Sequence, residues 1–231
     1  MAKAIANESY MNFISVKGPE LLNQYVGESE KNIREVFNNA KINSPCVLFF
    51  DEVDSIAPRR SKNSDSNNVM DRIVSQFMAE MDNINNSTTN INNVIIVAST
   101  NRPDLVDESL LRPGRFDKMI YAGIPSNAEE RYKVLESISS KVNNVNNNDL
   151  KYISEKCSNN FSGADLNALF SESYSLAFKE YLESCNSKDI SDFKILRIHL
   201  DKAYNKITPS LSNEELEKYK NLNIKYNSIY K

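Results

Sequence analysis

The chain has 231 residues, of which 40% are hydrophobic and 26% charged, as in ordinary globular proteins. The net charge of −3 argues against a generally basic nucleic-acid binder. No apolar run approaches the roughly 20 residues of a membrane span, and no secretory signal is expected. Three scattered cysteines without a Cys-x-x-Cys pair argue against a structural zinc site and fit a reduced cytoplasmic setting.

Short apolar and β-branched runs predict strands in the first half of the chain, over residues 13–16, 46–50, 94–98 and 119–122. Three of these four runs consist almost entirely of apolar or β-branched residues, as expected where helices cover both faces of a parallel sheet. Helical spacing predicts two buried helix faces between these strands: Ile33, Val36, Phe37 and Ala40, then Ile73, Phe77 and Met81. The alternation predicts an α/β fold with a doubly wound parallel sheet over residues 1–125.

Residues 126–231 show no further strand pattern and are predicted to form a small all-helical domain. Three helix starts are predicted from capping boxes, in which a serine precedes an acidic residue by three positions: Ser126 with Glu129, Ser162 with Asp165, and Ser212 with Glu215. The single histidine, His199, is predicted to be a helix-face residue, because a catalytic base needs a partner and a cleft.

Two adjacent carboxylates, Asp51 and Glu52, follow the apolar strand over residues 46–50. In open α/β sheets, ligands bind beyond the carboxyl ends of the strands. Asp51 is therefore a candidate Mg²⁺ ligand, and Glu52 a candidate base for a water that attacks a phosphate. A solvated acidic turn at a strand end explains the same stretch, and this alternative stays open.

Polar residues also follow the strand over residues 94–98, and two arginines flank a later Pro-Gly turn. Asn101 is a candidate to bind a phosphate oxygen or to position the attacking water, or it forms a turn before Pro103. Arg112 and Arg115 are candidates to stabilise charge on a transferring phosphoryl group. The alternative for both arginines is a weak ion pair on the surface.

The order and spacing of five short segments resemble the AAA ATPases over nearly the whole chain. QYVG (24–27) is similar to the family's aromatic pore loop, VLFFDE (47–52) to its Walker B motif and ASTN (98–101) to its sensor 1. LLRPGRFD (110–117) is similar to the second region of homology, and FSGAD (161–165) to the start of the small-domain helix. Longer segments resemble the second ATPase domain of two-ring members. Both the valosin-containing and the peroxisome-biogenesis types fit, with a modest preference for the peroxisomal type in RPGRFDKMIYAGI.

This resemblance implies a homo- or hetero-hexameric ring that uses ATP and Mg²⁺ to unfold or translocate polypeptides or to remodel complexes. Asp51 would be the Mg²⁺ ligand, Glu52 the catalytic base and Asn101 the γ-phosphate sensor. Arg112 and Arg115 would be arginine fingers that reach into the neighbouring subunit's site. The family binds adaptors through N-terminal domains that are absent from this sequence.

Further residues take their implied roles from the same resemblance. Gly163 and Ala164 would lie against the nucleotide, and Tyr25, Val26 and Gly27 would form a pore loop that grips polypeptides by stacking and apolar contact. Asp82 occupies a position linked to signalling between subunits. We expect no nucleic-acid partner and no membrane span, and a location in the cytoplasm or at the periphery of an organelle membrane.

The family's phosphate-binding loop, Gly-x-x-x-x-Gly-Lys-[Ser/Thr], is absent, since none of the five glycines is followed by Lys-Ser or Lys-Thr. In relatives, the segment resembling AKAIANES lies directly after that loop. We therefore expect the sequence to begin just past its phosphate loop, without the preceding strand, and this chain alone to bind ATP very weakly and to be inactive. The alternative is a non-hydrolysing AAA-like subunit or interaction module that contributes Arg112 and Arg115 to a neighbour.

Overall fold

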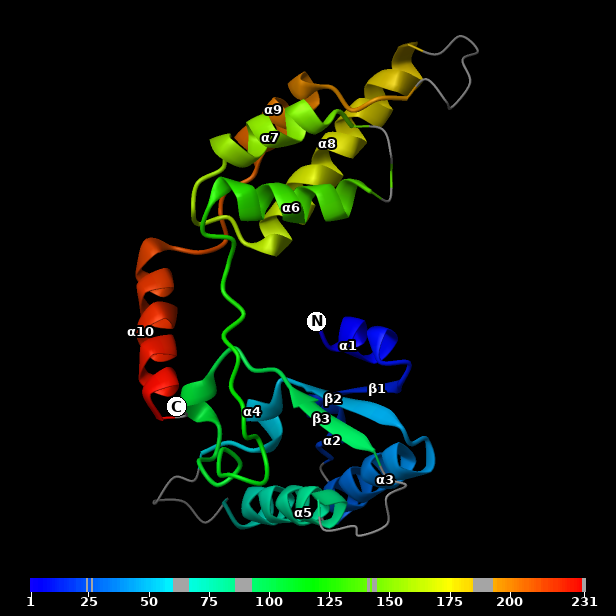
Figure 1. Ribbon diagram of the computed structural model, residues 1–231, viewed down its shortest axis with the longest axis vertical. Helices are drawn as coiled ribbons and strands as arrows, with labels where there is room; N and C mark the ends of the chain where they lie inside the picture. The colour runs from blue at the N-terminus through cyan, green and yellow to red at the C-terminus, as the bar shows by residue number, and fades with distance from the viewer. Residues whose placement is uncertain are drawn as a thin grey trace. The chain divides into compact units, whose positions relative to one another are not determined.

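The computed structural model describes residues 1–23, 25, 27–59, 67–85, 93–140, 142, 145–184 and 193–229. Contacts divide the chain into two compact units, Met1–Lys118 and Met119–Lys231 (Figure 1). The first unit contains Asp51, Glu52 and Asn101, the residues predicted to follow the strands. The second unit contains the helix predicted to begin near Ala164. The domain boundary predicted between residues 125 and 126 stays a prediction.

A three-stranded parallel sheet in the order β1-β2-β3 forms the centre of the first unit (Figure 1). The strands are β1 (Asn12–Lys17), β2 (Cys46–Asp51) and β3 (Val94–Ala98). Val47, Leu48 and Phe50 of the central strand are fully buried, which explains the continuous apolar run. The predicted parallel sheet is confirmed, and its register places the carboxyl ends of the three strands at one edge.

Helices cover both faces of this sheet, with α1 on one side and α3 and α5 on the other (Figure 1). The helices of the first unit are α1 (Ala2–Glu8), α2 (Gly18–Leu21), α3 (Glu28–Ile42), α4 (Val53–Ile56) and α5 (Asn67–Asn85), with a short 3₁₀ helix at Pro103–Leu105. Phe37 of α3, Phe50 of β2 and Phe77 of α5 pack together, with ring centroids 4.9–5.7 Å apart. The two predicted helix faces are therefore buried where the pattern placed them, except that Val36 is half-buried.

The strand predicted over residues 119–122 is wrong, because residues 117–126 form neither helix nor strand. Ile120 and Tyr121 are 79% and 44% exposed. A strand persists only when its N–H and C=O groups pair with a neighbouring strand, and among the described residues no strand pairs with this segment. Apolar composition alone therefore over-predicted a strand here.

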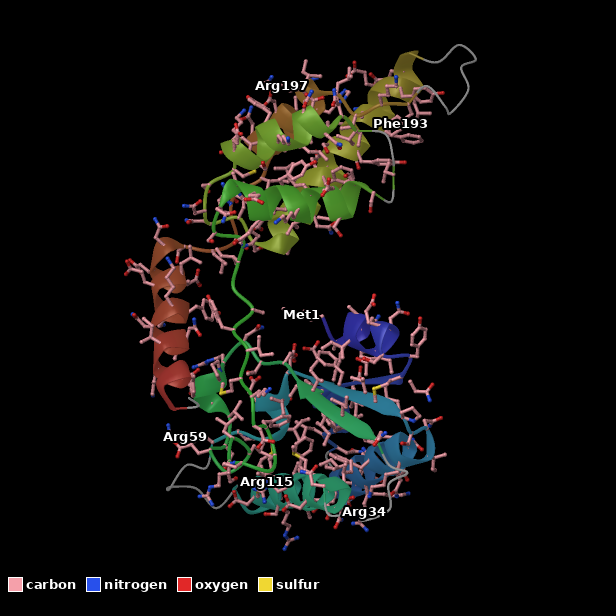
Figure 2. All side chains as sticks on the ribbon, in the orientation of Figure 1. Met1, Arg34, Arg59, Arg115, Phe193 and Arg197 are labelled. Carbon is pink, nitrogen blue, oxygen red and sulfur yellow. The ribbon has the colours of Figure 1, made fainter. Side chains whose placement is uncertain are left out.

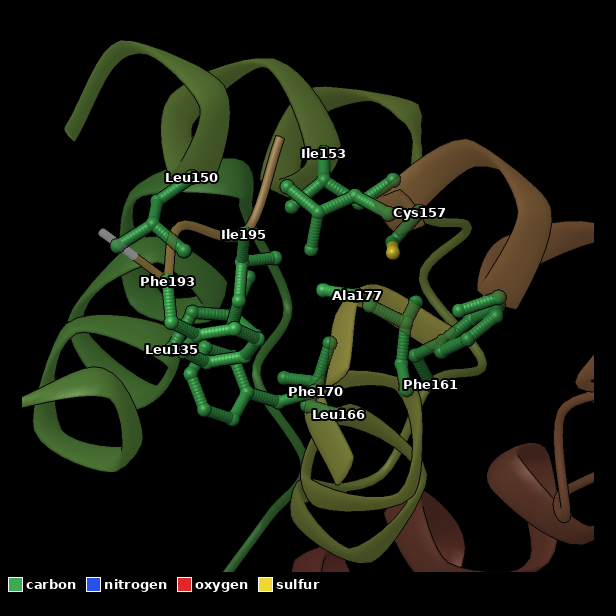
Figure 3. Packing of buried hydrophobic residues seen from close by; sticks show 13 residues of the cluster. Leu135, Leu150, Ile153, Cys157, Phe161, Leu166, Phe170, Ala177, Phe193 and Ile195 are labelled. Atoms are coloured by element: carbon green, nitrogen blue, oxygen red, sulfur yellow. The ribbon is translucent and has the colours of Figure 1, made fainter. Parts of the chain in front are cut away.

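The second unit is all-helical over its described residues, apart from a single bridge between Val145 and Ile195. Its helices are α6 (Ala128–Ser139), α7 (Asn147–Lys156), α8 (Gly163–Ser184), α9 (Arg197–Lys206) and α10 (Asn213–Ile229). Residues of α6 to α9 and of the segments joining them form one core, which includes Leu135, Ile153 and Leu166 (Figure 3). Burial raises the pKa of the Cys157 thiol in this core to about 11, so this cysteine is a packing residue.

Two of the three predicted capping boxes are confirmed. Ser162 and Asp165 exchange hydrogen bonds at the start of α8, with N–H to carboxylate and N–H to hydroxyl distances of 2.8 and 3.2 Å. Ser212 and Glu215 do the same before α10, at 2.9 and 3.2 Å. These pairs satisfy N–H groups that have no partner inside the helix.

The third capping box is wrong by one position. The helix begins at Ala128 with Asn127 as its cap, and the Asn127 side chain accepts a hydrogen bond from the Glu130 N–H at 2.8 Å. The Ser126 N–H donates to the Glu130 carboxylate at 2.8 Å rather than to Glu129. Asparagine caps helices as well as serine does, so the serine pattern alone misplaced the start.

Candidate active site

The carboxyl ends of β2 and β3 hold the predicted acidic and polar residues next to one another. The Ser99 N–H donates to the Phe50 carbonyl at 2.8 Å, and the Val53 N–H donates to the Ser99 carbonyl at 3.1 Å. The Ser99 hydroxyl donates to Asp51 Oδ1 at 2.5 Å. The structure therefore brings together two of the predicted segments, although Asp51 and Ser99 are 48 residues apart in the sequence.

Asp51 is a half-buried carboxylate oriented by the Ser99 hydroxyl. The described residues contain no group of three or more histidine, cysteine or acidic side chains that could enclose a metal ion. Mg²⁺ does not require such a group, since it is commonly held by one or two carboxylates together with waters and phosphates. The residues present at this edge fit a Mg²⁺ ion that arrives with a phosphate ligand.

Glu52 occupies the turn between β2 and α4 in a left-handed backbone conformation, with φ 56° and ψ 51°. For a non-glycine residue this conformation costs on the order of 1–3 kcal/mol, and such residues gather at functional sites. The Glu52 carbonyl accepts hydrogen bonds from the Ser55 N–H at 3.0 Å and from the Ser55 hydroxyl at 2.7 Å. The turn is thus fixed by its backbone, while the Glu52 side chain is exposed.

Asn101 lies in the loop that follows β3, between two anchored neighbours. The Thr100 hydroxyl donates to Asp54 of α4 at 2.6 Å and accepts from the Arg102 N–H at 2.9 Å. Arg102 also forms an ion pair with Asp104 at 3.3 Å. The loop is therefore tied to α4, and it presents the exposed side chain of Asn101 from a fixed backbone.

Arg112 and Arg115 lie in one turn but in different surroundings. The Arg115 side chain lies beside α5 (Figure 2). Its guanidinium makes a bidentate contact with Asp82 of that helix, with Nε and Nη2 at 3.0 and 2.9 Å from the two carboxylate oxygens. Its Nη1 donates to the Ser109 carbonyl at 2.8 Å. The Arg115 side chain is only 21% exposed, whereas Arg112 is exposed. Their turn depends on Gly114, whose φ of +89° favours glycine.

The ion pair changes the protonation equilibria of both partners. The hydrogen bonds and charge of Arg115 hold the pKa of the Asp82 carboxyl below its ordinary value of 3.8. The Asp82 carboxylate in turn raises the pKa of the Arg115 guanidinium. Both groups therefore remain charged in the folded protein at neutral pH. The family resemblance implies separate roles for Asp82 and Arg115, and no local pattern in the sequence predicts this contact.

The predicted pore loop is described at two of its three positions, because Val26 lies outside the described residues. Tyr25 is 70% exposed directly before α3. Gly27 caps that helix with a φ of +90°, a conformation that glycine adopts at little cost. The structure thus presents an aromatic side chain to solvent at the start of a helix that is anchored in the core by Phe37.

A pocket of about 530 Å³ in the second unit has Gly163 in its wall. The other lining residues come from the segment before α6 and from one face of α6: Ala122, Gly123, Ile124, Pro125, Glu130, Lys133 and Val134. An added Cβ at Gly163 would have no neighbour within 4 Å, so the space beside this glycine is open. Ala164 is exposed on the first turn of α8 but does not line the pocket.

Residues 1–124 match the model of the ATPase family associated with various cellular activities, AAA. The chain belongs to the AAA ATPases. Residues 147–192 match the AAA+ lid domain, so the small helical domain of this AAA chain is also confirmed. The parallel sheet with a helical lid is the AAA fold that the sequence predicted.

Several curated relatives of this AAA chain bear the name Peroxisomal ATPase PEX6. The protein of Dictyostelium discoideum is 47% identical over 225 residues, covering 95% of this chain and 18% of the relative. Those of Arabidopsis thaliana and Schizosaccharomyces pombe are 42% and 43% identical, over 96% and 95% of this chain. The chain spans 24% and 25% of the length of these two relatives. Likeness to the peroxisomal type of AAA ATPase is thereby confirmed.

Membership of the AAA ATPases implies nucleotide binding. A local pattern in the sequence predicted that Asp51 and Glu52 lie at the carboxyl end of β2, and the structure places them there. The local pattern did not predict the hydrogen bond from the Ser99 hydroxyl to Asp51 or the hydrogen bond from the Thr100 hydroxyl to Asp54, because both join segments far apart in the sequence. Within the described part of the AAA chain, no helix has the length and apolar character to cross a membrane.

Proposed function

We propose that this chain forms part of a ring ATPase subunit that couples ATP hydrolysis to polypeptide unfolding, translocation or complex remodelling. The observation that carries the proposal is the joint position of Asp51 and Glu52 beside the loop containing Asn101, at one edge of a parallel sheet. Ligands bind at this edge in α/β folds. The proposed cofactors are ATP and Mg²⁺.

The roles follow from the chemistry of the three side chains. Asp51 holds Mg²⁺, which when bound neutralises charge on the phosphates. Glu52 accepts a proton from the attacking water, and its exposed carboxylate beyond the strand end is free to reach one. Asn101 donates its amide to the γ-phosphate from a backbone held by Thr100.

In this proposal the second unit supplies two residues that contact the nucleotide. Gly163 and Ala164 take this role from their place in FSGAD, and the pocket that Gly163 lines supports the role of Gly163. Ile124 and Val134 give that pocket apolar surface suited to an aromatic base.

Assembly completes the site in the proposed ring, which is a homo- or hetero-hexamer. Arg112 and Arg115 act on the neighbouring subunit's nucleotide, and Tyr25, Val26 and Gly27 grip the polypeptide substrate. The name Peroxisomal ATPase borne by the relatives supports a role in peroxisome biogenesis. The proposed location is the cytoplasm or the periphery of an organelle membrane. Adaptors bind through N-terminal domains.

The test is ATP turnover by the natural full-length protein with Glu52→Gln. We expect nucleotide binding to remain and turnover to fall at least about 100-fold, because the substitution removes the base and keeps its shape. Glu108→Gln is the matched control, since Glu108 is an exposed carboxylate of the same unit, 2.7 Å from Arg59. Turnover retained by Glu52→Gln contradicts the proposal.

A non-hydrolysing AAA-like subunit or interaction module is the second candidate, favoured by the exposed side chain of Arg112, which can act on a neighbouring subunit without hydrolysis in this chain. Such a subunit lends Arg112 and Arg115 to a neighbour and performs no hydrolysis itself. In an assembled ring, Glu52→Gln would then leave turnover unchanged while Arg112→Ala would lower it. The same pair of variants therefore separates the two functions.

A further inference from the structure

Gly18 lies against the backbone of Glu52 with no room for a side chain. It begins α2 directly after β1, and Glu52 follows the neighbouring strand β2. Because β1 and β2 are parallel, the helices that leave them, α2 and α4, meet at the same edge. An added Cβ at Gly18 would lie 2.4 Å from the Glu52 carbonyl oxygen and 2.1 Å from Ser55 Oγ.

These two contacts differ in how easily they can be relieved. The Ser55 side chain can rotate away, although it would lose its 2.7 Å hydrogen bond to the Glu52 carbonyl. The carbonyl is part of the Glu52 backbone, so it moves only if Glu52 moves. Real Cβ atoms essentially never approach another atom closer than 3.0 Å, so the turn must shift by several tenths of an ångström.

Backbone conformation gives no separate reason for a glycine at this position. Unlike Gly27 and Gly114, Gly18 does not have a positive φ, and it forms the first residue of an α-helix. Other residue types adopt that conformation freely. The requirement at residue 18 is therefore one of space, and the space is occupied by the Glu52 turn.

We propose that Gly18 is a positioning residue for Glu52. Because Gly18 has no side chain, α2 can pack against the turn formed by Glu52 and Ser55. This packing holds Glu52 in its left-handed conformation. This inference rests on the proposed function of Glu52 as the base. A catalytic group displaced by about 1 Å can lose about 100-fold in rate, so even an alanine at residue 18 is expected to impair hydrolysis.

The experiment compares Gly18→Ala, Glu20→Ala and Glu52→Gln in the natural full-length protein. Glu20 is the matched control, because it is exposed on the same helix α2. For Gly18→Ala we expect kcat to fall about 10- to 100-fold while the Kd for ATP stays within about twofold. The Ser55 amide, which donates to the Glu52 carbonyl, is expected to exchange its hydrogen faster than in the wild type.

The outcomes separate the inference from the function on which it rests. If Glu52→Gln is inactive while Gly18→Ala retains wild-type kcat, the inference is overturned and the proposed function stands. If Glu52→Gln retains turnover, the proposed function fails, and the exchange rate of the Ser55 amide alone then decides the inference.

A second variant covers the case in which Gly18→Ala does not fold. Ser55→Ala keeps Gly18 and removes only the hydroxyl hydrogen bond to the Glu52 carbonyl. A lowered kcat with unchanged ATP binding supports the inference, and a wild-type kcat overturns it. Where both single variants fold, the double variant Gly18→Ala/Ser55→Ala is expected to keep a lowered kcat, because the added Cβ still meets the Glu52 carbonyl. A wild-type kcat in the double variant would show that the Gly18→Ala effect acts through the Ser55 side chain, and would overturn the inference.

Discussion

Arg115 and Asp82 form a bidentate ion pair with N–O distances of 3.0 and 2.9 Å. The pair fixes the turn that contains Arg112 and Arg115 against α5. The pair joins residues 33 positions apart. It holds the guanidinium in a defined direction within the isolated subunit. Arg112 in the same turn is exposed.

Asp82→Asn is expected to loosen this turn. The carboxylate is 44% exposed, so solvent screening limits the pair to about 1 kcal/mol. Because the folded-state pKa of Asp82 is lowered, this contribution is complete above its ordinary pKa and is lost as the pH falls through the folded-state pKa. Hydrogen exchange of the turn over residues 109–117 measures the loss at pH 7. Asp104→Asn, in the exposed pair with Arg102, is the control, and equal effects of the two variants would contradict the prediction.

Arg112→Ala and Arg115→Ala are expected to differ in their effect on the subunit itself. Both should lower ATP turnover of the assembled ring by about 1,000-fold or more, the range seen for arginine fingers. Only Arg115→Ala should also speed hydrogen exchange in α5 and the turn, because Arg112 is exposed. Turnover and exchange measured on the same preparations check this, and an active Arg112→Ala ring would refute the assignment.

Asp165→Ala is expected to destabilise the second unit. One oxygen of Asp165 accepts hydrogen bonds from the N–H and hydroxyl of Ser162 and of Ser210, at 2.8–3.2 Å, and the residue is 8% exposed. Burial raises its pKa, but these hydrogen bonds outweigh burial and lower it. Removing the acceptor leaves several donors without their partner, at a cost of about 2 kcal/mol.

The pH dependence and a matched variant test the Asp165 prediction further. Since the folded-state pKa is lowered, the stabilisation is present above the ordinary value of 3.8 and disappears as the pH falls through the folded-state pKa. Glu215→Ala removes the same kind of capping carboxylate from an exposed position, and should cost less. Thermal unfolding of both variants at pH 7 measures the difference, and the prediction fails if Glu215→Ala is the more damaging.

The chain expressed by itself is expected to bind ATP·Mg²⁺ very weakly. Tight binding of the β- and γ-phosphates needs a backbone N–H cradle and a lysine, and no Gly-x-x-x-x-Gly-Lys-[Ser/Thr] occurs in the sequence. Titration calorimetry on the 231-residue chain tests this expectation. A micromolar Kd would show that the edge with Asp51 binds nucleotide without such a loop.

Local patterns predicted the central part of the fold and the acidic edge well. β2 is a continuous apolar run that ends in Asp51, so burial and the change to polar residues are both visible in the sequence. The helix faces of α3 and α5 follow from the 3.6-residue period. The strand over residues 119–122 failed because pairing depends on a neighbour, and pairing partners are not part of a local pattern.

Contacts between distant segments could not be predicted in the same way. The Ser99–Asp51 hydrogen bond and the packing of Gly18 on Glu52 arise only when two parallel strands end at one edge. His199 lies in helix α9, as the sequence predicts. Its burial, the hydrogen bond that it accepts from the Leu196 N–H at 3.1 Å and its 3.0 Å distance from Glu180 could not be predicted from the local pattern.

The ring cluster of Phe37, Phe50 and Phe77 has a mechanical consequence. Phe50 immediately precedes Asp51, and its ring lies 5.7 Å from that of Phe37 in α3. Close-packed aromatic rings transmit displacement rather than absorbing it. The acidic end of β2 and helix α3 are therefore packed together through this cluster, and moving one away from the other would open a gap between the rings.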